Sequence, residues 1–152
     1  MNERPSSLER LLSGHRRVAL DSNVLIYLAD DFGGRGQIAG RVVAALIELQ
    51  IETVLATVGL SEVLTGPARA GDVVGFELLA DELREVGLRL VPLDASIAGD
   101  AAWLRGRARF DLIDAIHVAS ARAAGATLFL TNDRGIPSLP QLEVAYLDDL
   151  VA

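Results

Sequence analysis

Four acidic side chains stand beside predicted β-strands, where they could act together. Asp21 closes the first strand, Glu62 lies just after the second, and Asp133 directly follows the fourth. Asp114 lies in the first turn of the helix that is expected before that fourth strand. In an open parallel sheet, ligands bind beyond the carboxyl ends of the strands. We therefore expect the four carboxylates to gather at this edge of the sheet.

Gathered carboxylates need a counter-ion. Each acid alone has an ordinary explanation, because carboxylates near helix N-termini are stabilised by unpaired N–H groups and the helix dipole. Four together repel and raise one another's pKa unless cations neutralise them. Oxygen ligands in a chain without cysteine favour Mg²⁺ or Mn²⁺ over Zn²⁺. Two such ions about 3.5–4 Å apart can activate water and stabilise the leaving oxygen of a phosphodiester. The pattern predicts a nuclease site.

Short apolar runs alternate with helical patterns, which is typical of parallel strands joined by crossover helices. The expected strands are Arg17 to Asp21, Thr53 to Val58, Leu88 to Leu93, Thr127 to Thr131 and Val144 to Leu147. The expected helices are Ser22 to Ala29, Gln37 to Gln50, Leu60 to Thr65, Val73 to Val86, Asp94 to Arg105 and Leu112 to Ala124. Gly33 to Gly36 and Gly66 to Gly71 are predicted loops. The fold class is α/β, with a doubly wound parallel sheet of about five strands flanked by helices.

A length of 152 residues with 51% hydrophobic residues predicts one compact domain. We expect this domain at residues 17–152, after an N-terminal extension at residues 1–16. The extension is polar and broken by Pro5, so it lacks the apolar centre of a secretory signal. No run reaches the roughly 20 apolar residues that span a bilayer. A cytoplasmic protein without membrane contact is expected.

The charge pattern excludes several classes of protein. Lys plus Arg number 14 and Asp plus Glu 21, so the formal charge of −7 opposes nucleic-acid binding through overall charge. Every basic side chain is Arg. The absence of Lys argues against P-loop NTPases and against phosphoryl-transfer proteins that place Lys beside the phosphoryl group. A dinucleotide-binding Rossmann domain needs glycines straight after the first strand, where this chain has Ser22 and Asn23.

The order and spacing of four motifs resemble the PIN domains and, within them, the VapC-like toxins of bacterial toxin–antitoxin pairs. The motifs are Leu20-Asp21-Ser22-Asn23, Ser61-Glu62, Asp114-Ala115-Ile116-His117 and Leu130-Thr131-Asn132-Asp133, and the resemblance runs from about Val18 to Leu147. It implies a three-layer α/β/α fold, hydrolysis of RNA with Mg²⁺ or Mn²⁺, a homodimer, and inhibition by a cognate antitoxin. An RNA-processing nuclease without antitoxin and a catalytically silent PIN binding module remain as alternatives.

The resemblance also implies roles for individual residues. Asp21, Asp114 and Asp133 are expected as metal ligands, and Glu62 as a ligand or a water-positioning acid. Ser22, Asn23 and Thr131 match polar positions beside the acids, where a hydrogen bond would orient a carboxylate. Ser22 and Asn23 serve equally well as N-caps of the helix that follows.

Residues near Asp114 leave further alternatives. Asp111 fits best as the N-cap of the same helix, which leaves Asp114 as the ligand. His117 lies one turn from Asp114 and is expected to be packed or to support a ligand rather than act as a base. Trp103 and Tyr27 lie in apolar helical patterns, so we expect both in the core.

Arginines could hold the phosphates of a polyanionic substrate. Arg105, Arg107 and Arg109 lead into the Asp114 helix, and the bidentate guanidinium group matches phosphate. A solvated turn explains this run equally well. Arg69 and Arg134 are weaker candidates for the same role.

Overall fold

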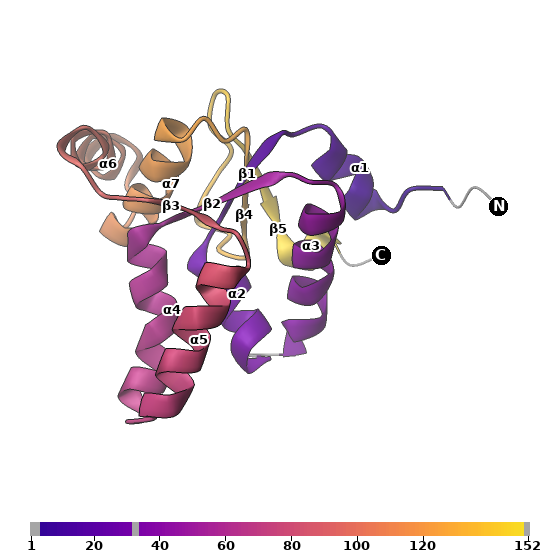
Figure 1. Ribbon diagram of the computed structural model, residues 1–152. Coiled ribbons are helices and arrows are strands. Elements are labelled where there is room, and N and C mark those ends of the chain that lie inside the picture. The colour runs from indigo at the N-terminus through magenta and orange to yellow at the C-terminus, as the bar shows by residue number, and fades with distance from the viewer. Residues whose placement is uncertain (1–3, 32–33, 151–152) are drawn as a thin grey trace.

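The central sheet has five parallel strands in the order β3-β2-β1-β4-β5. The computed structural model describes residues 4–31 and 34–150 (Figure 1). Its strands are β1 (Arg17–Leu20), β2 (Glu52–Ala56), β3 (Arg89–Val91), β4 (Leu128–Thr131) and β5 (Glu143–Tyr146). The chain builds outward from β1 through β2 to β3, and then crosses to β4 on the other side of β1. The predicted doubly wound sheet is therefore confirmed, with its topological switch point between β1 and β4.

Helices cover both faces of the sheet. They are α1 (Ser7–Ser13), α2 (Ser22–Asp30), α3 (Gly36–Glu48), α4 (Thr57–Arg69), α5 (Val73–Glu85), α6 (Ala95–Ala108) and α7 (Leu112–Ala123). Figure 1 shows α6 and α7 on the side of the sheet opposite α1 and α3, while α4 and α5 run side by side as a projecting pair. The arrangement is the three-layer α/β/α architecture expected from the sequence.

Alternation along the strands divides the interior into two apolar clusters. In β4, Phe129 packs with α6 and α7 in the first cluster. Leu128 and Leu130 pack with the helices of the other face in the second cluster. In β1, Ala19 belongs to the first cluster and Val18 to the second. Because successive side chains of a strand point to opposite faces, strands with both faces covered are apolar throughout. The continuous apolar runs in the sequence follow from this burial.

Several local boundaries predicted from the sequence are wrong. The helix predicted to end at Thr65 extends as α4 to Arg69 and carries Pro67 within its last turns. The predicted loop at Gly66 to Gly71 is thus mostly helical, because packing of α4 against α5 outweighs the local preference of glycine and proline. Gly36, also expected in a loop, begins α3. No helix of the described residues is both long and apolar enough to cross a bilayer.

Part of the expected N-terminal extension forms a helix that joins the core. Ser6 and Glu9 form a capping box at the start of α1, with each side chain bonded to the other's backbone N–H. Leu8 and Leu12 are buried in the same cluster as Val18 and Leu46. Residues 7–13 are therefore integrated into the packed structure.

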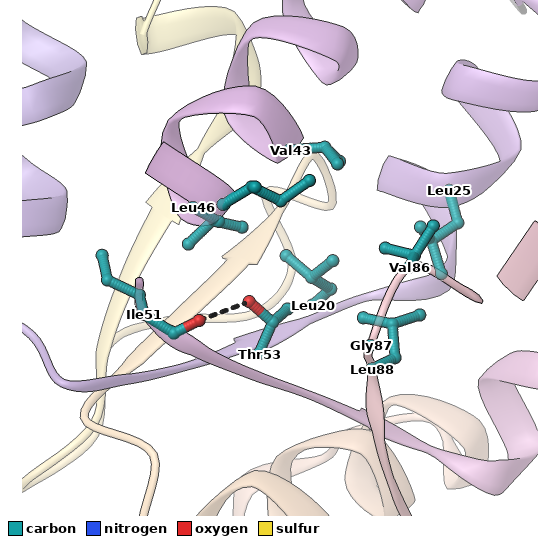
Figure 2. A pocket seen from close by; sticks show the side chains of 10 residues that line it. Leu20, Leu25, Val43, Leu46, Ile51, Thr53, Val86, Gly87 and Leu88 are labelled. Carbon is teal, nitrogen blue, oxygen red and sulfur yellow. Dashed lines mark hydrogen bonds between the residues drawn. The ribbon is translucent and has the colours of Figure 1, made fainter. Parts of the chain in front are cut away.

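A small apolar cavity lies within this second cluster. Figure 2 shows side chains of β1, α2, α3 and the approach to β3 converging on it, among them Leu20, Leu25, Leu46 and Leu88. Its volume is about 60 Å³, and the hydroxyl of Thr53 at its wall donates a hydrogen bond to the Ile51 carbonyl at 3.3 Å. None of the four acids lines the cavity, so it is separate from the acidic edge of the sheet.

Truncation of Leu12 tests whether α1 belongs to the folded core. We expect Leu12→Ala to lower the free energy of unfolding by about 2–5 kcal/mol, because a fully buried leucine leaves a cavity. Arg10→Ala, an exposed position on the same helix, is the matched control and should change it by less than about 0.5 kcal/mol. Equal effects of the two variants in denaturant unfolding would contradict the burial of α1.

Candidate active site

Asp21 lies at the carboxyl end of β1 and begins the turn into α2. It is the N-cap of this helix, with an extended backbone, and its Oδ1 accepts a hydrogen bond from the Ser22 N–H at 2.7 Å. The alternative that Ser22 or Asn23 caps the helix is wrong, since the backbone is already helical at Ser22. The side chain of Asp21 is buried, and the residue is only 5% exposed. The bend at the end of the strand thus holds this carboxylate inside the protein.

Polar side chains from two elements orient the Asp21 carboxylate. The Thr131 hydroxyl, at the end of β4, donates to Asp21 Oδ2 at 2.7 Å, and Asn23 Nδ2 donates to the same oxygen at 3.3 Å. Thr131 Oγ1 also accepts from the Asp133 N–H at 3.0 Å. Burial raises the pKa of Asp21, and this effect outweighs the opposing charge of His117 and the hydrogen bond from Thr131. Thr131 therefore links the backbone at Asp133 to the carboxylate of Asp21.

Glu62 meets a buried histidine that comes from α7. Glu62 Oε1 lies 2.7 Å from His117 Nε2, and Asp21 Oδ1 lies 3.6 Å from the same nitrogen. One ligand atom from each of these three residues falls within 4.8 Å of the others. The imidazole fits against α4 because position 59 is glycine, where a Cβ would lie 2.8 Å from His117 Cε1. Asp21, Glu62 and His117 thus form one compact group.

The contact between Glu62 and His117 has the electrostatics of an ion pair. Burial lowers the pKa of His117, but the hydrogen bond to Glu62 and the charges of Asp21, Glu62 and Asp114 outweigh burial and raise it. Burial raises the pKa of Glu62, but hydrogen bonds from His117 and Ser22 outweigh burial and lower it. Each partner therefore stabilises the charged form of the other.

Asp114 faces the cluster from the first turn of α7. Asp111 is the N-cap of this helix, as predicted, since its Oδ1 accepts from the Ile113 N–H at 2.9 Å. The pKa of Asp114 is raised from 3.8 to about 7, first by burial, then by hydrogen bonding and repulsion with Asp133, and then by the charges of Asp21 and Asp111. The structure thus brings Asp21, Glu62, Asp114 and Asp133 into one electrostatically connected group, here called the acidic cluster.

The acidic cluster fits a divalent cation. Among residues 4–31 and 34–150, no arginine pairs with any of the four carboxylates, and the one basic side chain in contact with them is His117, which reaches Asp21 and Glu62. Asn23 Oδ1 is also buried beside Asp21 without a hydrogen-bond partner. Mg²⁺ and Mn²⁺ prefer carboxylate and amide oxygens as ligands. The acidic cluster offers such oxygens with little positive charge beside them. Burial first, and then repulsion from Asp133 and Asp21, raise the pKa of Asp114, which is the response expected of carboxylates gathered with little opposing charge.

The other predicted site residues take varied positions. Ser22 is buried, with its hydroxyl 3.4 Å from Asp21 Oδ1. Arg69, near the end of α4, lines a groove of about 370 Å³ together with Glu62 and Asp30. Arg134 forms a bidentate ion pair with Asp149 and is therefore already engaged by a carboxylate.

The expectation for Trp103 is wrong. Trp103 is 68% exposed on α6, and the Arg107 guanidinium lies 5.8 Å from the centre of the indole ring. The expectation for Tyr27 is confirmed, because this side chain packs partly buried against the core. Arg105, Arg107 and Arg109 are exposed, and no carboxylate in the described part of the chain forms an ion pair with them.

His117 is the site residue that the sequence undervalued. It lies three positions after Asp114 on α7, so both side chains occupy neighbouring places on one face of the helix. This spacing was the available signal. Its contact with Glu62, 55 residues earlier, depends on how α7 packs against α4 and could not be read from either motif alone.

Comparison with known proteins identifies the family. The PIN domain model matches residues 18–142. The chain belongs to the PIN-domain family. No curated protein matches its sequence. Among solved structures, it is similar to a chain of VapBC2 from Rickettsia felis bound to a DNA fragment from its promoter, with a TM-score of 0.69 and 15% identity over 86% of this chain and 98% of that one.

Two further solved structures are similar. The chain matches a toxin–antitoxin complex from Klebsiella pneumoniae with a TM-score of 0.62 and 21% identity, over 82% of this chain and 94% of that one. It also matches VapC20 of Mycobacterium tuberculosis, described as a sarcin–ricin loop cleaving toxin, with a TM-score of 0.59 and 18% identity over 74% and 86% of the two chains. At these identities the likeness shows the shared fold.

Replacing Asp114 with asparagine tests the charge deficit without any substrate. Because the pKa of Asp114 is raised to about 7 in the folded protein, its proton stabilises the metal-free fold below about pH 4, and this stabilisation is lost as pH rises through 7. In chelator at pH 8, Asp114→Asn should therefore be more stable than wild type by about 1–2 kcal/mol, allowing for solvent screening. The difference should shrink as pH falls through 7 and vanish below about pH 4. A variant less stable than wild type in denaturant unfolding at pH 8 would contradict this account.

Substitution of His117 tests its pairing with Glu62. His117→Leu leaves a half-buried carboxylate without its donor, and we expect a loss of about 1–3 kcal/mol in unfolding free energy at pH 6. Since the pKa of His117 is raised, the stabilisation by its charged form is complete below its ordinary value of 6.5 and is lost as pH rises through the folded value. The loss should thus be smaller at pH 9. His117→Gln keeps a nitrogen donor and should recover part of the loss, whereas identical losses for both variants would exclude the pairing.

Proposed function

We propose that this PIN-domain protein is a ribonuclease that uses Mg²⁺ or Mn²⁺ to hydrolyse RNA phosphodiester bonds. The observation that carries the proposal is the acidic cluster, whose four carboxylates meet at the β1–β4 switch point without an arginine partner among the described residues. A fold that only bound a partner would gain nothing from keeping such repulsion near its surface. A site that takes up divalent cations gains its affinity from it.

Each residue of the acidic cluster has a proposed role. Asp21, Asp114 and Asp133 hold the cation, and Glu62 is either a further ligand or the acid that positions water. When bound, the cation supplies Lewis-acid stabilisation of charge on the phosphate. Thr131 and Asn23 keep the Asp21 carboxylate oriented through their hydrogen bonds to Oδ2. His117 holds Glu62 beside Asp21 through the contact between Nε2 and Oε1.

We further propose that the nuclease is the toxin of a toxin–antitoxin pair. Support comes from the similar structures, of which one contains VapBC2 and another is described as a toxin–antitoxin complex. The chain covers 98% and 94% of those two chains, so it has the full extent of their fold. On this proposal a cognate antitoxin covers the site, the active form is a homodimer, and the protein works in the cytoplasm on RNA.

Cleavage of RNA by matched variants tests the nuclease proposal. Wild type should cut single-stranded RNA with Mg²⁺ or Mn²⁺ and stop when a chelator is added. Asp114→Asn should lose at least about 100-fold in rate, because loss of a ligand exceeds the 10–100-fold cost of losing a residue that merely supports one. Gel assays or a fluorogenic RNA measure both rates.

Asp111→Asn is the control for that experiment. It removes a carboxylate from the same helix three residues earlier, yet asparagine caps helices as well as aspartate does. We expect its cleavage rate to stay within a few-fold of wild type. Cleavage that persists in chelator, or undiminished cleavage by Asp114→Asn, would remove the proposed function. If the wild-type protein binds RNA but does not cleave it, the alternative of a catalytically silent PIN binding module is favoured instead.

A further inference from the structure

We propose that the exposed end of α6 is a docking surface for single-stranded RNA, on which Trp103 stacks against an unpaired base and neighbouring arginines contact phosphates. We call Trp103, Arg105, Arg107 and Arg109 the α6 platform. The inference rests on the proposed ribonuclease function and deepens it, because it identifies where RNA outside the reacting phosphate is held. It is carried by the exposure of Trp103 and by the charge and shape of its surroundings.

Trp103 contributes nothing to the core on which α6 rests. Ile97, Ala101 and Leu104 of α6 are buried in the first apolar cluster, whereas Trp103 is 68% exposed. It is the single tryptophan of the chain and is among the most exposed of its large hydrophobic residues. Loss of water contact by an indole is favourable on binding, so an exposed tryptophan is well suited to a partner.

The surface around Trp103 is unusually open. Gly99 lies four residues before it and Gly106 three residues after it, so all three occupy one face of α6. A Cβ built on either glycine would meet no atom within 4 Å. Glycine within a helix weakens it, and neither position has a packing reason to be glycine. What the two glycines provide is free space beside Trp103 on this face of α6.

The α6 platform is also a local reversal of the overall charge. Six other arginines, Arg17, Arg35, Arg84, Arg89, Arg122 and Arg134, form ion pairs with carboxylates. Arg105, Arg107 and Arg109 fall within five residues, are exposed, and form no ion pair with described residues. In a chain of formal charge −7, this concentration of cationic groups is complementary to a polyanion. The helix dipole accounts for basic residues in the last turn, but it does not account for the adjacent indole.

Chain connectivity places the end of α6 directly before the first turn of α7, which carries Asp114. Arg109 adopts a left-handed conformation, with φ 60°, that ends α6 and turns the chain into α7. Asp111 then caps α7, and Asp114 follows in its first turn. Figure 1 shows α6 and α7 packed beside each other, so the carboxyl end of α6 adjoins the amino end of α7. At 1.5 Å per residue, Trp103 lies about 8 Å back from the end of α6.

Single-stranded RNA is the occupant that fits these features best. Unpaired bases stack on aromatic side chains and on guanidinium planes, and Arg107 already lies over the Trp103 ring. Guanidinium groups bind phosphate oxygens in bidentate geometry. A protein partner would need an apolar core to its interface, but on this part of α6 the exposed neighbours of Trp103 are alanine, glycine and arginine.

Tryptophan fluorescence can report on this surface directly, because the chain has one tryptophan. The full chain carrying Asp114→Asn, in chelator, is titrated with a ten-nucleotide oligoadenylate. We expect binding to quench the emission of Trp103. In the same background, measured by anisotropy of a labelled oligonucleotide, Trp103→Ala should weaken binding about 10-fold and Trp103→Phe by much less. Arg107→Gln should weaken binding and lower the slope of log affinity against log salt by about 0.7.

Controls separate the α6 platform from general effects. Arg84→Gln removes an exposed arginine of α5 that is paired with Asp81, and it should leave the affinity unchanged. Gly106→Leu fills the space beside the indole while favouring the helix, so it should weaken binding in a fully folded protein. Unchanged emission on RNA binding, together with wild-type affinity of Trp103→Ala, would overturn the proposal. The proposal would also be overturned if Trp103→Ala converted a dimer to a monomer without changing the affinity for RNA. That result would assign the surface to a contact between proteins.

The outcome is distinguishable from failure of the nuclease proposal. In the chain with Asp114 intact, Trp103→Ala should raise KM for RNA cleavage about 10-fold and leave kcat within a few-fold, since the indole lies outside the acidic cluster. Normal cleavage with unchanged KM would leave the ribonuclease standing and remove the α6 platform. Quenching and affinity are read without cleavage, so they decide the platform even if the chain hydrolyses no RNA.

Discussion

Repulsion among four carboxylates, of which Asp21 is buried and the other three are partly exposed, is the constraint around which this molecule is organised. Four acids converge where β1 and β4 end, and the surrounding polar groups reduce the repulsion without cancelling it. Thr131 and Asn23 donate to Asp21, and His117 pairs with Glu62. No side chain of the described residues donates to Asp114 or Asp133 in a comparable way, and burial together with repulsion from Asp133 raises the pKa of Asp114 to about 7. The metal-free fold therefore retains an electrostatic cost that its apolar layers must offset.

The two apolar clusters supply that offset and also fix the geometry. Both faces of β1 and β4 are buried, so these strands are held in register up to the pair Leu20 and Leu130. The next residues, Asp21 at the end of β1 and Asn132 and Asp133 after β4, leave the sheet. A small displacement of either strand would change the separation of Asp21 and Asp133. The site is thus placed by backbone hydrogen bonds rather than by flexible loops, which suits a site that must match an ion.

The sequence predicted the features that depend on short-range patterns. Strand positions followed from apolar runs, and the acids followed from their places at the ends of these runs. The capping role of Asp111 could be read because aspartate three residues before a polar helical position is a local signal. The capping box of Ser6 and Glu9 was equally local, but the short apolar stripe of α1 gave little reason to expect a helix there.

Features set by packing between distant segments could not be predicted. The contact of Glu62 with His117 joins residues 55 positions apart, and the ion pair of Arg35 with Asp148 joins residues 113 positions apart. Trp103 was misplaced because α6 is rich in alanine, glycine and arginine and shows no strong apolar face. Pro67 was read as a helix breaker, although α4 accommodates it near its end. In each case a tertiary contact overrode a weak local preference.

The close fit of His117 against Gly59 ties two distant positions in the chain into one evolutionary unit. A Cβ at position 59 would lie 2.6 Å from Leu55 Cδ1 and 2.8 Å from His117 Cε1, so the glycine makes room for both side chains. A smaller residue at position 117 would remove one of these two overlaps, so a side chain at position 59 would be less costly beside it. Substitutions at these two sites should therefore be epistatic, and an alignment deep enough to resolve covariation would pair them.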